Sequence, residues 1–592
     1  MVFLIYNDDY TIITFLPVFF GAISSAILLY ILIYICLYIF KFTNKLIIYM
    51  SSFIFVLINI SLIVDFLIFR LYKFHINAMV LNIITSPDAM DSIELGVFPV
   101  VVFLSIIISF IFFEIYFIKK ILSRTAEENL AINKKMNNLL TIPFILIFLG
   151  EKLTYGVATL INKNEIITKF KVIPLYQPLT FNRLAAKLFD YKPVPKVENT
   201  INRKASLNYP LNPIILSENS NKFNIFIFAS DAVRNSVINR DVTPNIEEFK
   251  KDAYTFNNHH SGGNATRFGI FSLIYGINST YWFNFLSSTQ KPVLFDVLKQ
   301  LDYQIDIISS TNTNWPEFRK TCYIDILGSI KDDFNGKPWE KDKQSTEYFL
   351  NIIDKYKKDK PIFSFVFLDA PHGYSYPKEF NKFKASDTNI NYLTVSKDGK
   401  DIKSVFSRYK NSVNYNDALF LKMINKLKEN NLYENSMIIY TSDHGQEFYE
   451  YGFFGHNSSF SKAQTNSPLI IKLPKNINNI NLPDNYANNL TSHNDIVPSI
   501  LSMIGIKNNP EDYSNGQNLF SKDFKRDFVF SANWNNNAII TNDFIYVFSN
   551  SPNKMFNNEV RDKNTYKKLK ETSPTNTKMI LSIMNENRKF LK

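Results

Sequence analysis

Four long apolar runs dominate the first 161 residues of the chain. They lie at about 11–40, 46–69, 96–118 and 139–161. Crossing the hydrocarbon core of a bilayer takes about 20 residues of helix, and each run is long enough. The sequence therefore predicts an all-α transmembrane bundle over residues 1–161.

Ionisable residues also occur within or at the edges of these runs, namely Asp65, Glu114, Glu151 and Lys152. A charge at membrane depth is expensive and by default suggests a functional group. The alternative, which we favour, is that these residues lie in the bundle interior or at its interface and have local partners.

Basic residues in the short loops predict the orientation of the bundle. Lys41 and Lys45 follow the first run, and the loop after the third run carries Lys119, Lys120, Arg124, Lys134 and Lys135. Such loops stay in the cytoplasm. The loop with Asp88, Asp91 and Glu94 is then expected outside, as is everything after about residue 162.

A connector with several prolines is expected over 162–222, and after it short apolar strands alternate with amphipathic helices. Expected strands are 223–229, 303–308, 361–368, 436–441 and 468–473; expected helices are 291–301, 345–358, 405–430 and 494–504. Strands that are apolar on both faces and separated by helices predict a largely parallel sheet covered on both sides. We therefore expect one extracytoplasmic α/β domain over 223–592.

Polar residues follow three of these strands, where ligands bind in such sheets. Asp231 follows the first strand, Asp369 and His372 follow the third, and Asp443 and His444 follow the fourth. A single aspartate there commonly caps a helix. Three such strand ends are harder to explain by capping alone.

A glycine-rich loop, Gly262-Gly263-Asn264-Ala265, leads into an apolar segment that begins at Thr266. Thr266 is then at a helix N-terminus, where backbone N–H groups and the helix dipole stabilise an anion. The simpler interpretation is that Thr266 is only an N-cap residue. The acidic residues that follow the strands weaken this interpretation.

Together these residues predict a metal-dependent reaction. Asp231, Asp443, His444 and the Thr266 hydroxyl form a four-ligand set for a divalent ion, with Zn²⁺, Mn²⁺ and Mg²⁺ left open. An ion lowers the pKa of a bound hydroxyl and makes it a nucleophile. His372 and His456 would hold the non-reacting oxygens, protonate the leaving group, or bind a second ion.

Charge and cysteine content narrow the possibilities. The chain has 65 Lys and Arg against 53 Asp and Glu, a net charge of +12. This is either a composition bias spread over the surface or affinity for an acidic partner. We find no recognisable nucleic-acid module, so nucleic acid is not expected. Cys36 and Cys322 alone exclude a disulfide framework and a cysteine zinc cluster.

The motifs over about 223–505 resemble the alkaline phosphatase/sulfatase superfamily. TSDHGQE with His456 beyond it is similar to phosphoethanolamine transferases and, more loosely, lipoteichoic acid synthases, and APHGYSYP resembles their substrate-histidine segment at His372. The resemblance implies Thr266 as the nucleophile. It also implies that His493 and Asp495 belong to a structural helix start. His259 and His260 are either supporting or merely packed residues.

The whole chain is more similar still to the YejM/PbgA group of inner-membrane proteins, which join a transmembrane bundle to a periplasmic sulfatase-like domain. The segments that carry this resemblance are KFHINAMVLNIITSPD, PLTFNRLAAKLF and SGGNATRFGIFSLIYG. The group typically has five spans, and this sequence predicts four. The resemblance implies a multi-pass protein of the bacterial inner membrane with a periplasmic C-terminal domain. It also implies membrane lipids as partners, either anionic phospholipid or lipopolysaccharide, and protein partners in envelope biogenesis.

Two departures limit what the resemblance implies. Sulfatases that use formylglycine have Pro and Arg at the second and fourth positions after the nucleophile, where this chain has Phe268 and Ile270. That route of sulfate-ester hydrolysis is therefore not expected. The disulfides typical of phosphoethanolamine transferases are absent, so membership in that group proper is not expected either.

Two functions from different classes remain. The first is a membrane-anchored, metal-dependent phosphohydrolase or phosphotransferase that acts on lipid or envelope head groups with a threonine nucleophile. The second is a non-catalytic, lipid-binding regulator of lipopolysaccharide and outer-membrane biogenesis. The six competent positions favour an enzyme, and the similarity of the whole chain to the YejM/PbgA group favours a regulator.

Overall fold

The structure is a computed structural model that describes residues 3–4, 10–39, 44–72, 74–77, 80–81, 97–161, 163–181, 185, 187, 206–386, 395–477, 480–549, 559–569 and 585–592. Some features expected from the sequence lie outside these residues: Lys41, the acidic loop with Asp88, Asp91 and Glu94, and the connector over 188–205.

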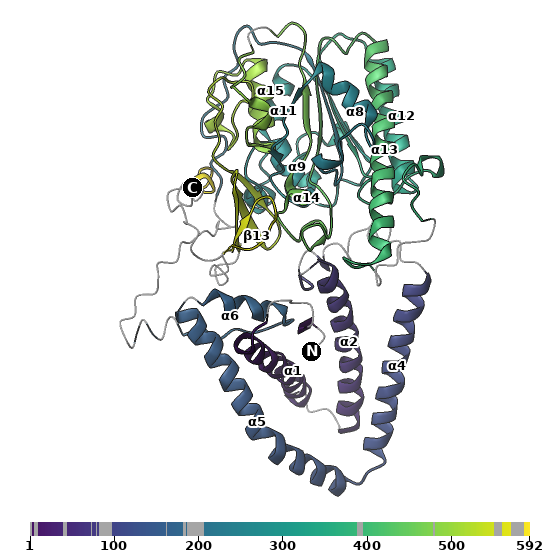
Figure 1. The fold of residues 1–592 in the computed structure, drawn as a ribbon, viewed down its shortest axis with the longest axis vertical. Coiled ribbons are helices and arrows are strands. Elements are labelled where there is room, and N and C mark those ends of the chain that lie inside the picture. Colours follow the sequence, from purple (N-terminus) through teal and green to yellow (C-terminus); the bar gives the residue numbers. More distant parts are fainter. Residues whose placement is uncertain are drawn as a thin grey trace.

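Four N-terminal helices are long and apolar enough to cross a membrane, as the sequence predicts (Figure 1). They are α1 (Ile12–Ile39), α2 (Asn44–Tyr72), α4 (Val97–Leu122) and α5 (Ala126–Leu160). Helix α5 begins well before the expected residue 139. A capping box at its start explains this, because the Thr125 side chain accepts from the Glu128 N–H and the Glu128 side chain accepts from the Thr125 N–H.

Three of the ionisable residues in these helices have local partners, as we expected. Asp65 Oδ2 lies 2.7 Å from His75 Nδ1. Glu151 accepts from Ser24 Oγ at 2.6 Å and Tyr176 Oη at 2.7 Å, and it pairs with Lys152 at 2.8 Å. For Glu114, which is half-buried, a local partner stays a prediction.

Part of the region expected to be a connector packs against the bundle. Helix α6 (Asn164–Lys169) and the short helix η2 (Phe170–Val172) follow α5. Phe170 and Ile173 share a buried cluster with Val18 of α1 and Phe69 of α2. These contacts attach residues 164–173 to the membrane helices.

Seven strands form the central sheet in the order β2-β10-β7-β1-β6-β4-β5. Their bounds are β1 Asn224–Ser230, β2 Tyr254–Thr255, β4 Gln304–Ser309, β5 Ile330–Lys331, β6 Ile362–Leu368, β7 Ser436–Ser442 and β10 Leu469–Lys472. The strands from β7 to β5 are parallel, whereas β10 and β2 at one edge run antiparallel to their neighbours. All five strands expected from the sequence are present, and the sheet is largely parallel as predicted.

Helices cover both faces of this sheet. The main ones are α8 (Pro244–Phe249), α9 (Thr266–Tyr275), α11 (Val293–Gln300), α12 (Pro338–Lys355), α13 (Lys400–Glu429) and α15 (Ile496–Ile504), with the shorter α10 (Trp282–Ser288) and α14 (Lys462–Thr465). Helix α12 begins earlier than expected, with Pro338 in its first turn, where a missing N–H costs nothing.

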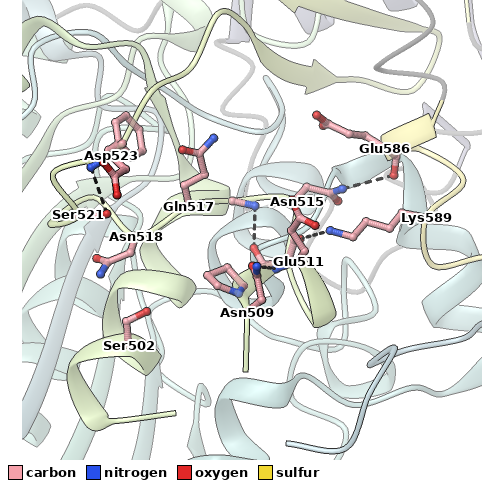
Figure 2. A pocket seen from close by; sticks show the side chains of 14 residues that line it. Ser502, Asn509, Glu511, Asn515, Gln517, Asn518, Ser521, Asp523, Glu586 and Lys589 are labelled. Atoms are coloured by element: carbon pink, nitrogen blue, oxygen red, sulfur yellow. Dashed lines mark hydrogen bonds between the residues drawn. The ribbon is translucent and has the colours of Figure 1, made fainter. Parts of the chain in front are cut away.

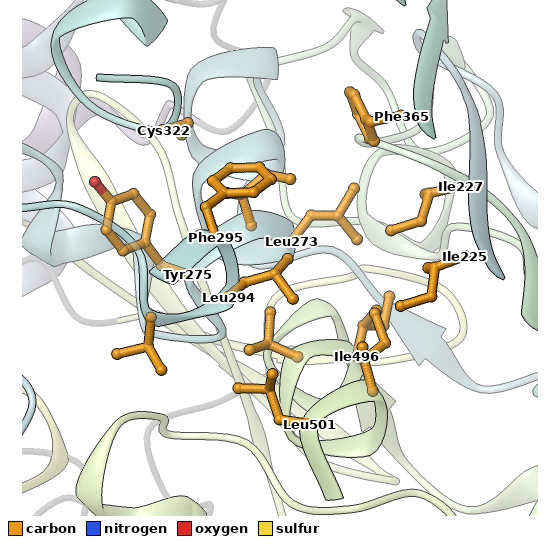
Figure 3. Close-up of a cluster of buried hydrophobic side chains, with 14 of the residues drawn as sticks. Ile225, Ile227, Leu273, Tyr275, Leu294, Phe295, Cys322, Phe365, Ile496 and Leu501 are labelled. Atoms are coloured by element: carbon orange, nitrogen blue, oxygen red, sulfur yellow. The ribbon is translucent and has the colours of Figure 1, made fainter. Parts of the chain in front are cut away.

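Alternate side chains of β1 are buried in two separate hydrophobic cores, one on each face of the sheet. Ile225 and Ile227 point into the cluster with α9, α11 and α15, part of which Figure 3 shows. Phe226 and Phe228 point into the second cluster, with side chains from α8, α12 and α13. This is the side-chain alternation of a strand whose two faces are both covered.

A second sheet, which the sequence analysis did not predict, follows α15. Its antiparallel strands are β12 (Val529–Ala532), β13 (Asn536–Ile540), β14 (Phe544–Ser549) and β15 (Glu559–Asp562). Ala532 donates to Gly262 O at 2.9 Å and accepts from the Asn264 N–H at 3.3 Å. This sheet therefore supports the glycine-rich loop ahead of Thr266.

Small strand pairs complete the domain. They are β3 (His259–His260) with β11 (Thr491–Ser492), and β8 (Glu447–Phe448) with β9 (Phe454–Gly455). The architecture agrees with the predicted fold class in its N-terminal bundle of long apolar helices and its C-terminal α/β domain with a largely parallel central sheet.

Candidate metal centre and nucleophile

The register of the central strands lines up three aspartates. In the pairing of β6, β1 and β7, Leu368 lies opposite Ser230, and Ser230 lies opposite Ser442. The next residue of each strand is an aspartate: Asp369, Asp231 and Asp443. Because the three strands are parallel, these carboxylates meet at one edge of the sheet.

Thr266 reaches the same place from helix α9, of which it is the first residue. Its hydroxyl lies 3.4 Å from Asp231 Oδ2 and 3.3 Å from His444 Nε2. The helix can approach this closely because of Gly269, where a Cβ would lie 2.2 Å from the Asp443 carbonyl oxygen. The expected position of Thr266 at a helix N-terminus is confirmed.

The ligating atoms of Asp231, Asp443 and His444 all lie within 4.8 Å of one another and are buried. His444 Nε2 is 3.2 Å from Asp443 Oδ2 and 3.9 Å from Asp231 Oδ1. Backbone N–H groups of Ala232 and His444 donate to Asp443 Oδ1 at 3.0 and 2.8 Å, which fixes this carboxylate.

Two oxygens of this cluster, Asp231 Oδ1 and Asp443 Oδ2, are buried and have no hydrogen-bond partner. A buried carboxylate oxygen without a partner is costly unless a cation balances it. Two carboxylates, an imidazole nitrogen and a hydroxyl are also a donor set suited to a divalent ion. The residues present therefore fit a divalent metal ion.

The electrostatics of the cluster also favour a bound cation. Burial raises the pKa of the Asp231 carboxyl well above its ordinary value, and the charges of Asp443 and Asp369 add to this effect. Burial lowers the pKa of the His444 imidazole, against the opposing charge of Asp443. A divalent cation would relieve the repulsion between the carboxylates.

The imidazole of His444 is followed by two more, those of His456 and His372, which extend away from this cluster. The ring centre of His456 is 4.5 Å from that of His444 and 5.2 Å from that of His372. Burial lowers the pKa of His456 well below its ordinary value, and its two imidazole neighbours act in the same direction. The structure thus brings all six predicted positions, Asp231, Thr266, His372, Asp443, His444 and His456, into one region.

Two residues to which the sequence analysis gave no role also belong to this region. Gln446 Oε1 lies 2.9 Å from His456 Nδ1, and Gln446 lies inside the motif TSDHGQE that drew attention to this segment. Asp369 Oδ1 is 3.8 Å from His372 Nδ1. Burial raises the pKa of Asp369 to about 6. The feature of the sequence that could have identified Asp369 is its position directly after a strand.

The other histidines named in the sequence analysis lie outside this cluster, and His493 contacts helix α9. His259 and His260 are buried, and their Nδ1 atoms lie 3.0 and 3.2 Å from the hydroxyls of Thr491 and Thr465. His493 Nδ1 lies 3.3 Å from the Gly269 carbonyl oxygen. Asp495 accepts from the Ser492 N–H at 2.8 Å, which confirms its place at a structural helix start.

A cavity of about 570 Å³ lies elsewhere, at the end of α15 and beside the C-terminal residues, and Figure 2 shows it. None of the six site positions lines it. Many of its polar groups bond to each other or to nearby backbone; for example, Lys589 donates to Ser514 O at 3.0 Å and Asn515 donates to Glu586 O at 3.3 Å. This cavity has no part in the cluster described above.

Comparison with known families agrees with this arrangement. The sulfatase family model matches residues 224–506, which contain all six positions. A domain of unknown function, DUF3413, matches residues 6–216, which contain the membrane helices. The C-terminal domain is thus a sulfatase-family domain.

One relative of known sequence is similar over nearly the whole chain. The inner membrane protein YejM of Salmonella typhi is 22% identical over 540 residues, covering 90% of this chain and 83% of that protein. An uncharacterized protein of Haemophilus influenzae is 25% identical over 339 residues, covering 57% of this chain and 50% of that protein. The chain is a homologue of the YejM inner membrane proteins and has a sulfatase-like domain. It is a multi-pass protein of the bacterial inner membrane whose C-terminal domain is periplasmic.

Among solved structures, the periplasmic domain of EcEptC from Escherichia coli is similar, with a TM-score of 0.45 and 17% identity. The match covers 57% of this chain and 96% of that domain. The phosphonate monoester hydrolase of Agrobacterium radiobacter gives a TM-score of 0.43 at 14% identity, covering 58% of this chain and 89% of that enzyme.

Proposed function

We propose that this protein is a membrane-anchored, metal-dependent phosphohydrolase or phosphotransferase that acts on lipid or envelope head groups. The observation that carries the proposal is the Thr266 hydroxyl, which lies at the start of a buried helix and within 3.4 Å of both Asp231 and His444. A hydroxyl in this position, beside two buried carboxylates, is arranged as a nucleophile.

Asp231, Asp443, His444 and Thr266 would hold a divalent ion, Zn²⁺, Mn²⁺ or Mg²⁺. When bound, such an ion supplies positive charge against the developing oxyanion and lowers the pKa of a bound hydroxyl. The remaining contribution comes from the chain itself. The first two N–H groups of α9, those of Thr266 and Arg267, have no carbonyl of the helix to donate to, so they can donate to the oxygens of a phosphoryl group placed above Thr266.

In the first step the Thr266 oxygen forms a bond to phosphorus, and the bond between phosphorus and the leaving oxygen breaks. Asp231, which accepts from the Thr266 hydroxyl, takes the proton. His372 gives a proton to the leaving oxygen, since it lies on the accessible side of the three imidazoles with 32% of its side chain exposed. In the second step the oxygen of water or of an acceptor hydroxyl forms a bond to phosphorus and gives its proton to His372. The bond between phosphorus and the Thr266 oxygen breaks, and Asp231 returns its proton to that oxygen.

His456 has a different role in this proposal. Its Nδ1 faces the oxygen of the Gln446 amide, which can only accept, so this nitrogen carries the proton. Its Nε2 is then an acceptor, and its lowered pKa keeps the ring neutral. His456 can therefore accept a hydrogen bond from a substrate hydroxyl or from protonated His372.

Purified full-length protein, supplied in turn with Zn²⁺, Mn²⁺ and Mg²⁺, tests the proposal with bis(4-nitrophenyl) phosphate and with phospholipid vesicles as substrates. We expect metal-dependent release of product. Thr266→Ala should abolish it while most of the bound metal is retained, and Thr266→Ser should keep part of it. If Thr266→Ala turns over as fast as wild type, the proposal is wrong.

A second candidate function is the non-catalytic, lipid-binding regulator of lipopolysaccharide and outer-membrane biogenesis. The observation in its favour is that the similarity to YejM extends over the membrane domain and not only over the sulfatase-like domain. Complementation separates the two functions: a deletion strain rescued fully by Thr266→Ala would favour regulation. Vesicles with anionic phospholipid or lipopolysaccharide test the proposed lipid partners, and co-purification tests protein partners in envelope biogenesis.

A further inference from the structure

The outer end of helix α2 is embedded in the sulfatase-like domain. Leu71, in the last turn of α2, is 8% exposed and belongs to the buried cluster formed with α8, α12 and α13. Arg70 donates to the carbonyl oxygen of the buried Val395 at 3.3 Å. Figure 1 shows α2 reaching the lower edge of the C-terminal domain. A membrane helix therefore supplies part of the periplasmic domain's packing.

Tyr72, the last residue of α2, packs against strand β9. Its ring centre lies 6.3 Å from that of Phe454. At Gly455 a Cβ would lie 2.9 Å from Tyr72 Cε1, and the φ angle of Gly455 is +79°. Both the close contact and the backbone conformation require glycine here.

The contact is one residue away from His456. Strand β9 pairs with β8, with Glu447 opposite Gly455 and Phe448 opposite Phe454. The residue before β8 is Gln446, and the residue after β9 is His456; these two bond to each other at 2.9 Å. The hairpin Glu447–Gly455 thus begins and ends in the catalytic region.

Hydrogen bonds fix both the hairpin Glu447–Gly455 and the end of α2 that contacts it. At the hairpin, Glu447 Oε1 accepts from the N–H groups of Tyr451 and Phe453 at 3.0 and 2.9 Å. At the membrane helix, Asp65 holds His75 and the Ile76 N–H, and His75 Nε2 lies 3.0 Å from Lys171 O. A shift of the outer end of α2 relative to the sulfatase-like domain would therefore move Gly455 and with it His456.

We propose that Tyr72 is a positioning residue through which the membrane domain places His456 in the catalytic site. The inference rests on the proposed function for its kinetic consequences, but the contact itself does not depend on activity. It implies that the periplasmic site is fully assembled only when α2 is packed beneath the hairpin.

The kinetic experiment uses the full-length protein in detergent with a water-soluble phosphodiester. We expect Tyr72→Ala to lower kcat by between about tenfold and a hundredfold, the effect of misplacing a group by about 1 Å, with metal content and KM unchanged. Tyr72→Phe keeps the ring and should keep kcat. Tyr49→Ala is the matched control, because Tyr49 lies on the same helix and is 52% exposed.

A double-mutant cycle shows whether Tyr72 acts through His456. In a His456→Ala background, Tyr72→Ala should cause no further loss of kcat. If the two losses multiply, Tyr72 does not act through His456 and the proposal is overturned.

Hydrogen exchange provides a readout that needs no activity. We expect faster exchange in the peptide that spans 447–456 in Tyr72→Ala but not in Tyr49→Ala. Unchanged exchange would overturn the positioning role. Wild-type protein without phosphodiesterase activity would overturn the proposed function, and the exchange result would still decide the role of Tyr72.

Discussion

Asp231 and Asp443 follow neighbouring parallel strands whose last residues, Ser230 and Ser442, lie directly opposite each other. Each of the two carboxylates has one buried oxygen without a hydrogen-bond partner. Without a cation this pair is a source of repulsion inside the domain. With a cation bound, the same two carboxylates become its ligands. Removing one of these charges should therefore stabilise the protein without metal and weaken the protein's metal binding.

Asp231→Asn should therefore stabilise the metal-free protein and abolish metal binding. The amide removes one of the repelling charges, and its NH₂ group can donate to Asp443 Oδ2. We expect the thermal unfolding midpoint with chelator to rise by about 2 °C or more, and the increase on adding Zn²⁺ or Mn²⁺ to disappear. A midpoint that falls in chelator would show that the carboxylates do not repel each other.

Three buried histidines should make a contribution to stability that is lost as the pH falls from 6.5 to 4. Burial lowers the pKa of His493 to about 4, and burial also lowers the pKa values of His259 and His260 well below their ordinary value. At these three histidines the unfolded chain binds protons more readily than the folded one, so their contribution to stability is present above pH 6.5 and is lost as the pH falls toward 4. The raised pKa values of Asp231 and Asp369 act in the opposite direction.

Denaturant unfolding of metal-free protein at several pH values measures this effect. His493→Gln should reduce the change in unfolding free energy over this range by up to about 3 kcal/mol. An unchanged pH dependence in His493→Gln would show that His493 is not the group that titrates.

Gly269→Ala should disrupt the site without changing any of the predicted metal-ligating residues. Its Cβ would lie 2.2 Å from the Asp443 carbonyl oxygen, so α9 must move away from β7. We expect a loss of stability of about 1–3 kcal/mol, together with loss of metal affinity, measured by unfolding and by metal titration. Gly328→Ala is the control, since a Cβ there meets nothing within 4 Å. Equal effects of the two substitutions would contradict the close approach at Gly269.

Glu317→Gln should destabilise the region beside Thr266. Arg267, which follows Thr266, pairs with Glu317 at 2.7 Å and lies 4.4 Å from the ring centre of Trp534 and 5.2 Å from that of Trp282. Burial lowers the pKa of Arg267 to about 10. Losing the carboxylate leaves a buried guanidinium uncompensated, at a cost of about 1–3 kcal/mol.

The matched control is Glu248→Gln, which breaks the exposed pair between Glu248 and Lys251. An exposed pair of this kind contributes less than about 1 kcal/mol. Chemical unfolding of the two variants compares them directly. If they lose the same free energy, Arg267 does not depend on Glu317.

Most of the sheet could be predicted because its strands are locally distinctive. Segments such as 224–230 are apolar on both faces, and each is followed by a polar residue, so hydrophobic pattern alone located them. The sheet β12–β15 escaped prediction. Its strands are short and partly polar, and its edge strand β12 contacts the distant loop residue Gly262 through Ala532.

The position of Asp369 beside the predicted site also needed the structure. In the sequence it was one of several acids after strands, and nothing local separates it from a helix cap. Only the register of β6 against β1 places it beside Asp231.

The sequence by itself determined the membrane helices, five strands of the central sheet and the six chemically competent positions, because hydrophobic period and residue chemistry are local properties. The tertiary structure decided which oxygens remain unpaired, how closely α9 approaches β7, and that Tyr72 lies against Gly455. Those contacts join residues hundreds of positions apart, and their distances depend on strand register and helix packing that no local pattern encodes.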